Sequence, residues 1–234
     1  MNFAVEEKVF ACFPGMQLPV VVARGVDNNG INAEISKELA LAWVSAGKAA
    51  AEFGNPQSHP AIKPWGEYFR ALGVSRKEYP SSIEALVRRA GKDAAPRTIN
   101  PLVDMYNAVS LLHLAPAGGF DLDQLENGLE LRFSREGDEF ESLDDPEACK
   151  VPAGEVSYAD GARILTRHFV WRQAKAGLIL PTSRNVLLVS EVLGELGTGA
   201  CQAVLERFAG GIRRHFRVEP EIYLLNSANS SIRI

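Results

Sequence analysis

One segment of the chain, residues 97–123, combines a well-specified helix with a glycine-rich stretch that follows it. Asn100 supplies an N-cap and Pro101 occupies the first helical position, so a helix is predicted to begin here. Asn100, Asp104 and Asn107 are spaced i, i+4 and i+7 and therefore share one face of this helix. Asn and Asp are weak helix formers, which favours fixed hydrogen bonds to loops or a ligand over a merely solvated face.

The helix is followed by a pair of glycines, Gly118 and Gly119, in a stretch that we interpret as a loop. Paired glycines permit positive φ and close approach of the backbone, which suits a loop that presents N–H groups to an anion or a carbonyl. A tight turn without a ligand has the same composition, so the sequence leaves both interpretations open.

The remaining pattern indicates an α+β fold, with helices concentrated in the first half of the chain. Apolar spacing and caps predict helices over 34–53, 65–72, 81–90 and 199–208. Apolar runs and alternation predict strands over 17–26, 129–133, 186–189 and 221–225. Alternation also predicts a strand that carries His168, Val170 and Arg172 on one face. We therefore expect helices packed on a mixed or antiparallel sheet.

The composition is that of an ordinary globular protein, with 46% apolar and 23% charged residues. No apolar run approaches the roughly 20 residues that a membrane-spanning helix needs. An acidic pair, Glu6 and Glu7, stands where a signal peptide would carry positive charge. The three cysteines form no zinc or disulfide pattern. We therefore expect a cytoplasmic protein with reduced thiols and no membrane association.

The net charge of −4 argues against a protein that coats duplex DNA. Two basic clusters, Arg88–Arg89 and Arg213–Arg217, fall near the ends of predicted helices, where cations complement the helix dipole. Contact with RNA is the alternative interpretation of these clusters. No metal-ligand spacing, G-x-S-x-G elbow or P-loop is present, so neither a metal nor a cofactor is predicted.

Residues 97–107 read Arg-Thr-Ile-Asn-Pro-Leu-Val-Asp-Met-Tyr-Asn. This stretch resembles the Arg-x-x-Asn-Pro-x-Val-Asp-x-x-Asn signature of the B3/B4 domain, the editing module of the phenylalanyl-tRNA synthetase β subunit. Further pieces resemble the family and keep its order: Phe120–Asp123, Leu129–Arg132, Gly137–Phe140 and Asn185–Leu188. Residues 65–73 and 82–89 resemble the extension of freestanding B3/B4 proteins.

The resemblance implies a single B3/B4-like domain over residues 1–234. Its parts are an N-terminal α/β extension at 1–58, a helical segment at 59–96, the core with family motifs at 97–193, and a C-terminal helix and strand at 194–234. The expected fold is the α+β fold of the synthetase's editing domain.

The function that the resemblance implies is a trans-acting aminoacyl-tRNA editing hydrolase, which acts on the 3′ end of a mischarged tRNA. The ester is already activated, so such an enzyme has to position a water and stabilise an oxyanion, without a metal or cofactor. Asp104 and His168 are the catalytic candidates, although a lone histidine on a strand is commonly structural. The candidates for binding substrate or tRNA are Asn100, Asn107, Gly118, Gly119, Asp121, Asp160, Arg172 and Gln173.

The sequence departs from the family at Gly118, where the synthetase domain has a histidine. The later Gly-Gly-Glu segment of the family, which helps to recognise tyrosine, is replaced here by residues 173–177. A substrate other than tyrosine is therefore expected. Some freestanding relatives act on tRNA(Arg) carrying canavanine, and a canavanyl-tRNA(Arg)-type substrate is one candidate. The carboxylates of Asp104, Asp121 and Asp160 suit a guanidinium-like side chain.

Two alternatives stay open at this point. The first is a noncatalytic B3/B4 module that binds tRNA, an amino acid or a protein partner. The second is a hydrolase of a small free ester or amide. The oligomeric state does not follow from the sequence.

Overall fold

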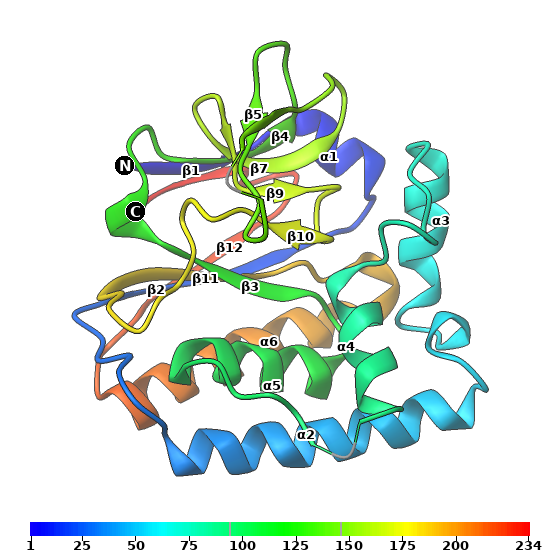
Figure 1. The fold of residues 1–234 in the computed structure, drawn as a ribbon, viewed down its shortest axis with the longest axis vertical. Coiled ribbons are helices and arrows are strands. Elements are labelled where there is room, and N and C mark those ends of the chain that lie inside the picture. The colour runs from blue at the N-terminus through cyan, green and yellow to red at the C-terminus, as the bar shows by residue number, and fades with distance from the viewer. Residues whose placement is uncertain (94, 146) are drawn as a thin grey trace.

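A four-stranded antiparallel sheet, in the order β12-β2-β11-β3, runs through the middle of the computed structural model, which describes residues 1–93, 95–145 and 147–234 (Figure 1). Its strands are β2 (Leu18–Arg24), β3 (Ala117–Asp121), β11 (Asn185–Ser190) and β12 (Glu221–Leu225). Val20 and Val22 face one hydrophobic core, whereas Val21 faces another. Because both faces of the sheet are buried, the sequence of β2 is a continuous apolar run without alternation.

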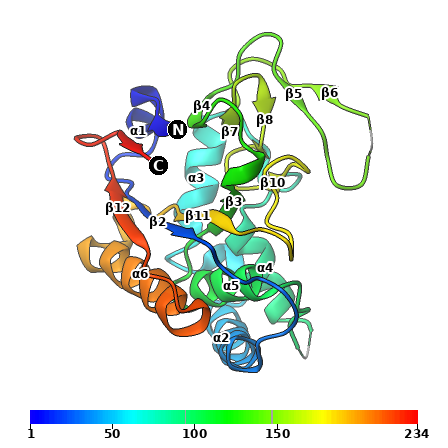
Figure 2. The same cartoon turned by 90° about the vertical axis from the view of Figure 1, so that its left-hand side faces the viewer.

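Three helices cover one face of this sheet: α2 (Ala33–Glu52), α5 (Pro101–His113) and α6 (Thr198–Gly211) (Figures 1 and 2). Helices α5 and α6 lie against the strands, and α2 lies below α5. Val21 and Leu188 from the sheet pack there with Met105 and Phe208 from the helices. None of the helices in the described parts of the chain is long and apolar enough to span a membrane.

A seven-stranded mixed sheet, in the order β13-β1-β4-β7-β8-β5-β6, lies on the other face. Its strands are β1 (Asn2–Val5), β4 (Leu129–Phe133), β5 (Glu139–Phe140), β6 (Cys149–Lys150), β7 (Val156–Asp160), β8 (Arg163–Ile164) and β13 (Ser231–Arg233). The pairs β1–β4 and β5–β8 are parallel. Residues 1–58 thus contribute β1 to the larger sheet and β2 to the smaller one.

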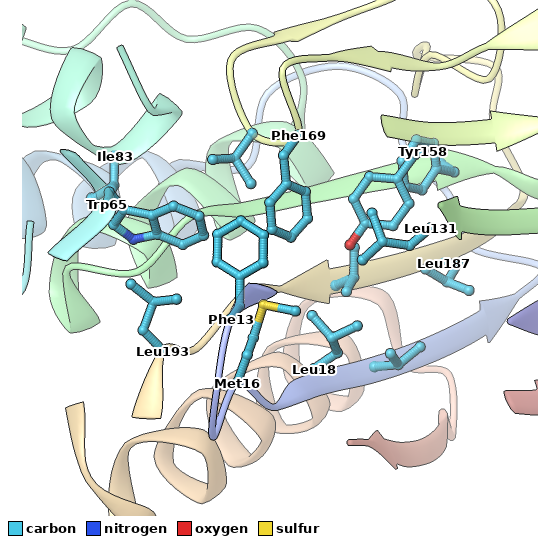
Figure 3. Packing of buried hydrophobic residues seen from close by; sticks show 14 of the residues in the cluster. Phe13, Met16, Leu18, Trp65, Ile83, Leu131, Tyr158, Phe169, Leu187 and Leu193 are labelled. Atoms are coloured by element: carbon cyan, nitrogen blue, oxygen red, sulfur yellow. The ribbon is translucent and has the colours of Figure 1, made fainter. Parts of the chain in front are cut away.

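An aromatic cluster fills the space between the two sheets (Figure 3). The ring of Phe169 packs against those of Phe13, Trp65 and Tyr158, with centroids 5.1, 5.7 and 6.1 Å away. Three helices surround this core: α1 (Glu7–Cys12), α3 (Lys63–Ala71) and α4 (Ser82–Ala90). Short helical turns complete the chain: η1 (Pro56–Ser58), η2 (Leu122–Gln124), η3 (Gly194–Leu196) and η4 (Ile212–Phe216).

The α+β class, the predicted helices and the strands over 17–26, 129–133, 186–189 and 221–225 are confirmed. The strand predicted through His168 is wrong. Two short strands, β9 (Thr166–Arg167) and β10 (Arg172–Gln173), form a hairpin whose tip is residues 168–171. His168 and Phe169 both have positive φ there, 45° and 62°. The tip is fixed because Phe169 is buried and its N–H donates to the carbonyl of Val156 over 2.6 Å.

The loop predicted at Gly118 and Gly119 is also wrong, because both residues belong to strand β3. They pair with Val189 and Leu188 of β11, and neither has a positive φ. The two glycines therefore form no turn. They lie within a strand, where the lack of a side chain allows close packing and leaves space open.

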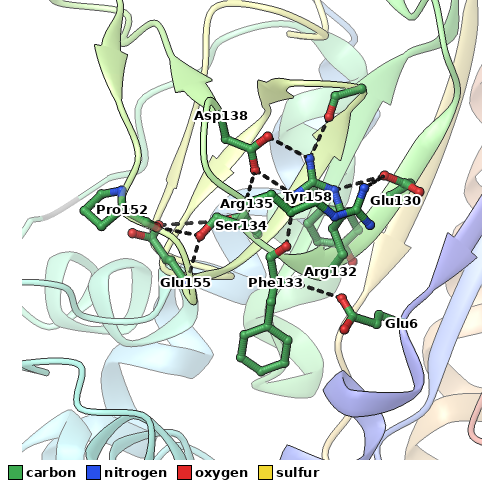
Figure 4. Close-up of polar contacts among 12 residues, drawn as sticks. Glu6, Glu130, Arg132, Phe133, Ser134, Arg135, Asp138, Pro152, Glu155 and Tyr158 are labelled. Atoms are coloured by element: carbon green, nitrogen blue, oxygen red, sulfur yellow. Dashed lines mark hydrogen bonds and ion pairs between the residues drawn. The ribbon is translucent and has the colours of Figure 1, made fainter.

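A buried arginine, Arg132, anchors residues 134–138, which follow strand β4 (Figure 4). The Arg132 guanidinium donates to both carboxylate oxygens of Asp138, over 2.7 and 3.0 Å, and to Glu130 over 3.0 Å. The Ser134 hydroxyl donates to the carbonyl of Pro152 over 2.7 Å. These partners compensate the buried charge of Arg132 and hold residues 134–138 against strand β4.

Helix α5 is anchored at its first residue. The Asn100 side chain accepts from the N–H of Val103 over 3.0 Å and from the side-chain amide of Asn28 over 3.0 Å. Its own amide donates to the carbonyl of Ile179 over 3.2 Å. Asn100 is therefore an N-cap that also ties two loops to the helix.

We expect Asn100→Ala to lower the free energy of unfolding by about 2–3 kcal/mol, since a cap is lost and buried partners are left unpaired. Asn107→Ala, on the same helix at a half-buried position, is the matched control and should change it by less than about 0.5 kcal/mol. Urea unfolding of both variants measures the difference. Equal effects of the two substitutions would contradict this role of Asn100.

Candidate functional site

A small cavity of about 100 Å³ lies beside the outer edge of strand β3, under the β9–β10 hairpin. We call it the β3 cavity. It brings together four of the residues predicted from the sequence: Gly118, Gly119, Arg172 and Gln173. Its other lining residues are Ser82, Ala117, Phe120, Tyr158, Thr166, Phe169, Val170, Trp171, Val189 and Glu191.

The two glycines contribute differently to the β3 cavity. A Cβ atom at Gly119 would lie 2.6 Å from Ile179 Cδ1, 2.7 Å from Leu188 Cδ2 and 2.9 Å from the Leu187 carbonyl oxygen. A Cβ atom at Gly118 would meet no atom within 4 Å. Gly119 is thus required for packing against β11, whereas Gly118 leaves space open.

Strand β3 is the last strand of its sheet, so half of its backbone groups face outward. The Gly119 carbonyl accepts a hydrogen bond from the Gln173 side chain over 3.0 Å at this edge. In an antiparallel pair the N–H and C=O of one residue point the same way, so the Gly119 N–H faces this edge as well. The site therefore contains a backbone donor beside the space left at Gly118.

A buried acid–phenol pair lies in the β3 cavity. The Tyr158 hydroxyl donates to Glu191 Oε1 over 2.6 Å, and the two residues are only 2% and 4% exposed. Burial raises the pKa of Glu191 to about 7, although the hydrogen bond from Tyr158 lowers it in part. Burial also raises the pKa of Tyr158, and the charge of Glu191 adds to that shift.

The mouth of the β3 cavity carries an aromatic ring and a cation. Trp171 packs edge-on against Tyr79, with ring centroids 4.7 Å apart, and is half-buried. The Arg172 guanidinium lies 5.9 Å from the Trp171 ring and forms an ion pair with Asp144. Such a rim offers a surface for stacking together with a positive charge.

The other acidic candidates lie outside the β3 cavity, and their carboxylates accept hydrogen bonds from the protein. Asp104 accepts from the N–H of Ile99 over 2.9 Å, and burial raises its pKa. Asp121 accepts from the Ser183 hydroxyl over 2.6 Å. Asp160 accepts from two backbone N–H groups over 2.9 and 2.6 Å and pairs with Arg163. Burial by itself would raise the pKa of Asp160. The hydrogen bonds and the charge of Arg163 lower it by more, so the net shift of the pKa is downward. Asn100 and Asn107 do not line the cavity either.

His168 lines a second cavity of about 340 Å³, on the other side of Phe169. Its ring lies 3.8 Å from the ring of Tyr79, and its Nδ1 atom lies 3.4 Å from Glu155. Burial lowers the pKa of His168, although the charge of Glu155 opposes the shift. The structure therefore separates His168 from the four residues that meet at β3.

A family model for the B3/4 domain matches residues 64–200, more than half of the chain. The chain belongs to the B3/4 domain family. It is 29% identical over 170 residues to the phenylalanine–tRNA ligase β subunit of Geobacter sulfurreducens, covering 69% of this chain and 20% of that protein. It is 34% identical over 141 residues to the β subunit of Yersinia pestis, covering 60% of this chain and 17% of that protein.

The chain thus spans about a fifth of the length of these relatives. Among solved structures, an N-terminal fragment of the phenylalanyl-tRNA synthetase β subunit from Pyrococcus horikoshii aligns with a TM-score of 0.45 and 8% identity. That alignment covers 93% of this chain and 49% of the fragment.

Among the lining residues that sequence reasoning missed is the buried acid–phenol pair of this B3/4 domain's cavity, Tyr158 and Glu191. A signal for Glu191 was present, because it is the one charged residue in the apolar stretch 186–193. An acid within a buried run points to a fixed partner or a ligand. No comparable pattern marks Tyr158, which an alternation rule assigns to a core.

The glycine geometry of this B3/4 domain predicts unequal effects of two matched substitutions. Gly119→Ala should lower the free energy of unfolding by about 1–3 kcal/mol because of overpacking against β11. Gly118→Ala should stay within about 0.5 kcal/mol of the wild type. Chemical denaturation tests the pair, and a larger loss at Gly118 than at Gly119 would refute the assignment.

Burial of Glu191 predicts a pH dependence of stability. The pKa rises from 4.5 to about 7 on folding, so its contribution is fully present below 4.5 and is lost as the pH rises through about 7. Glu191→Gln keeps an acceptor for Tyr158 but cannot ionise. Relative to this variant, the wild type should lose about 2–3 kcal/mol between pH 5 and pH 8.5 in urea unfolding. Parallel pH profiles of the two proteins would exclude the shift.

Proposed function

We propose that this B3/4 domain is a trans-acting aminoacyl-tRNA deacylase, which hydrolyses the ester between a wrong amino acid and the 3′ end of its tRNA. Membership of the B3/4 family supports this proposal, as does similarity to phenylalanine–tRNA ligase β subunits. The single observation that carries it is the outer edge of β3, where the Gly119 backbone and the space beside Gly118 border one cavity.

In this proposal the aminoacyl group enters the β3 cavity beside Gly118. The Gly119 N–H donates to the carbonyl oxygen of the ester as negative charge develops on that oxygen. This hydrogen bond lowers the barrier to attack by water. Gln173 holds the Gly119 carbonyl and so keeps the strand edge in place. The space at Gly118, where the synthetase family has a histidine, accommodates the attacking water.

The rim of the cavity is proposed to hold the end of the tRNA. Bases of single-stranded RNA stack on aromatic rings, and Trp171 offers a half-buried ring at the mouth. Arg172 then binds a terminal phosphate in exchange for its ion pair with Asp144.

In its more specific form, the proposal is that the substrate is of the canavanyl-tRNA(Arg) type. Tyrosine is not expected as the substrate, because residues 173–177 lack the family's Gly-Gly-Glu segment. A noncatalytic module that binds tRNA, an amino acid or a protein partner is the second candidate. Gly118 favours it, since the family's histidine is absent there.

The experiment is a deacylation assay with a panel of mischarged tRNAs that includes canavanyl-tRNA(Arg). We expect the protein to accelerate at least one deacylation by about 100-fold or more over the spontaneous reaction. Gly118→Leu fills the cavity and should lower this rate by at least about 100-fold, since small misplacements already cost that much. Gly118→Ala should remain within about threefold of wild type, because that site has room for a methyl group.

Asp104→Asn serves as the control for the sequence-based catalytic candidate. Its role at the start of α5 predicts retained activity in a folded protein. Loss of activity in Asp104→Asn, with Gly118→Leu still active, would move the site to the start of α5. No acceleration on any tRNA, together with tight tRNA binding, would favour the noncatalytic module.

A further inference from the structure

The buried pair of Glu191 and Tyr158 takes no part in the hydrolysis proposed above. Glu191 follows the last residue of β11 and lines the β3 cavity together with Tyr158 of β7. Figure 3 shows Tyr158 within the aromatic cluster between the sheets, and Glu191, its hydrogen-bond partner, is also buried. Both polar groups therefore border a cavity from within the core.

The surroundings of Glu191 leave its carboxyl group short of partners. Its carboxylate accepts hydrogen bonds from the Tyr158 hydroxyl and from its own backbone N–H, and within residues 1–93, 95–145 and 147–234 no ion pair includes it. The cationic residue among those that line the cavity, Arg172, pairs with Asp144. A carboxylate has about four acceptor positions, so about half of the hydrogen-bonding capacity of Glu191 is left for a ligand.

Apart from Ser82, Thr166, Arg172 and Gln173, the remaining wall of the cavity is apolar or glycine. Phe120, Phe169, Val170 and Val189 contribute hydrocarbon surface, and Gly118 contributes none of its own. A few convergent polar groups in an apolar cavity are what fixes the identity of a small ligand. A volume of about 100 Å³ suits a side chain and not a nucleoside.

We propose that Glu191 and Tyr158 determine the specificity of the β3 cavity, by selecting aminoacyl groups whose side chains end in N–H or O–H donors. Cationic guanidino or ammonium groups and aliphatic hydroxyl groups belong to this class. A hydrocarbon side chain of the same size is rejected, because it would displace water from a buried carboxyl group and leave that group unpaired. This inference rests on the proposed deacylase function and assigns its selectivity to two residues.

Tyr158 positions Glu191 in this scheme. Its hydroxyl donates to Oε1 over 2.6 Å and so fixes the orientation of the carboxylate toward the incoming donor. Its ring is itself held by Phe120 and Phe3, with centroids 5.1 and 6.0 Å away. The acceptor is therefore preorganised, and binding requires little rearrangement.

The test measures kcat/KM for canavanyl-, arginyl-, threonyl-, phenylalanyl- and leucyl-tRNA with the wild type, Glu191→Gln, Glu191→Leu and Tyr158→Phe. We expect the wild type to prefer donor-ended over hydrocarbon side chains by at least about 100-fold. Glu191→Leu should abolish this preference, and Tyr158→Phe should lower it by about tenfold. Glu191→Gln should lose the preference for cationic groups and keep that for hydroxyl groups.

The ratio between substrates is the decisive readout, because a merely structural role would lower all rates together. Circular dichroism and urea unfolding establish that each variant is folded. A ratio that stays unchanged in folded Glu191→Leu overturns the inference while leaving the deacylase function intact.

A binding measurement separates failure of the inference from failure of the proposed function. Non-hydrolysable 3′-aminoacylamino-adenosines that carry arginine or leucine are titrated by calorimetry. We expect the arginine analogue to bind the wild type at least about tenfold more tightly, and both to bind Glu191→Leu alike. This result without any hydrolysis refutes the deacylase function and supports the specificity pair. Equal binding of both analogues to the wild type, without hydrolysis, refutes both.

Discussion

The burial of one sheet on both faces is the constraint from which the rest of the structure follows. The strands β2 and β11 send alternate side chains into two separate cores, one beneath helices and one beneath a second sheet. Such strands have no polar face, so their position and register are fixed by packing on both sides. Strand β3 lies at the end of this sheet, and its pairing with β11 fixes its position. Its outer edge therefore lies next to the aromatic core.

The cavity arises at the point where packing changes from one core to the other. Gly119 is pressed against β11, and Gly118 next to it faces open space. A long side chain at position 118 would close the site, whereas even a methyl group at position 119 would displace the strand. Two of its polar groups, the Gly119 backbone and the Glu191 carboxylate, are positioned by the pairing of β3 with β11 and by the hydrogen bond from Tyr158. The candidate site is therefore a by-product of the same packing that defines the fold.

The sequence predicted the features that local chemistry determines. The Asn100 cap, the proline after it and the valine run of β2 each specify their structure within a few residues. The hairpin tip at His168 and Phe169 was missed because a buried aromatic ring there overrides alternation. Of the predicted site, Gly118, Gly119, Arg172 and Gln173 share one cavity. The grouping of Glu191 with Tyr158 depends on contacts between strands 33 positions apart, which no local pattern contains.

The edge of β3 is closed by irregular chain instead of another strand. The Gln173 side chain bonds to the Gly119 carbonyl, and the Asp121 N–H donates to the carbonyl of Gly177 over 2.9 Å. An edge closed in this way offers no continuous ladder to a neighbouring molecule, which protects the sheet from pairing with other copies. Loops also tolerate changes of length and sequence better than strands. The segment 173–177 therefore lets this B3/4 domain remodel the wall around a ligand without disturbing the sheet that supports it.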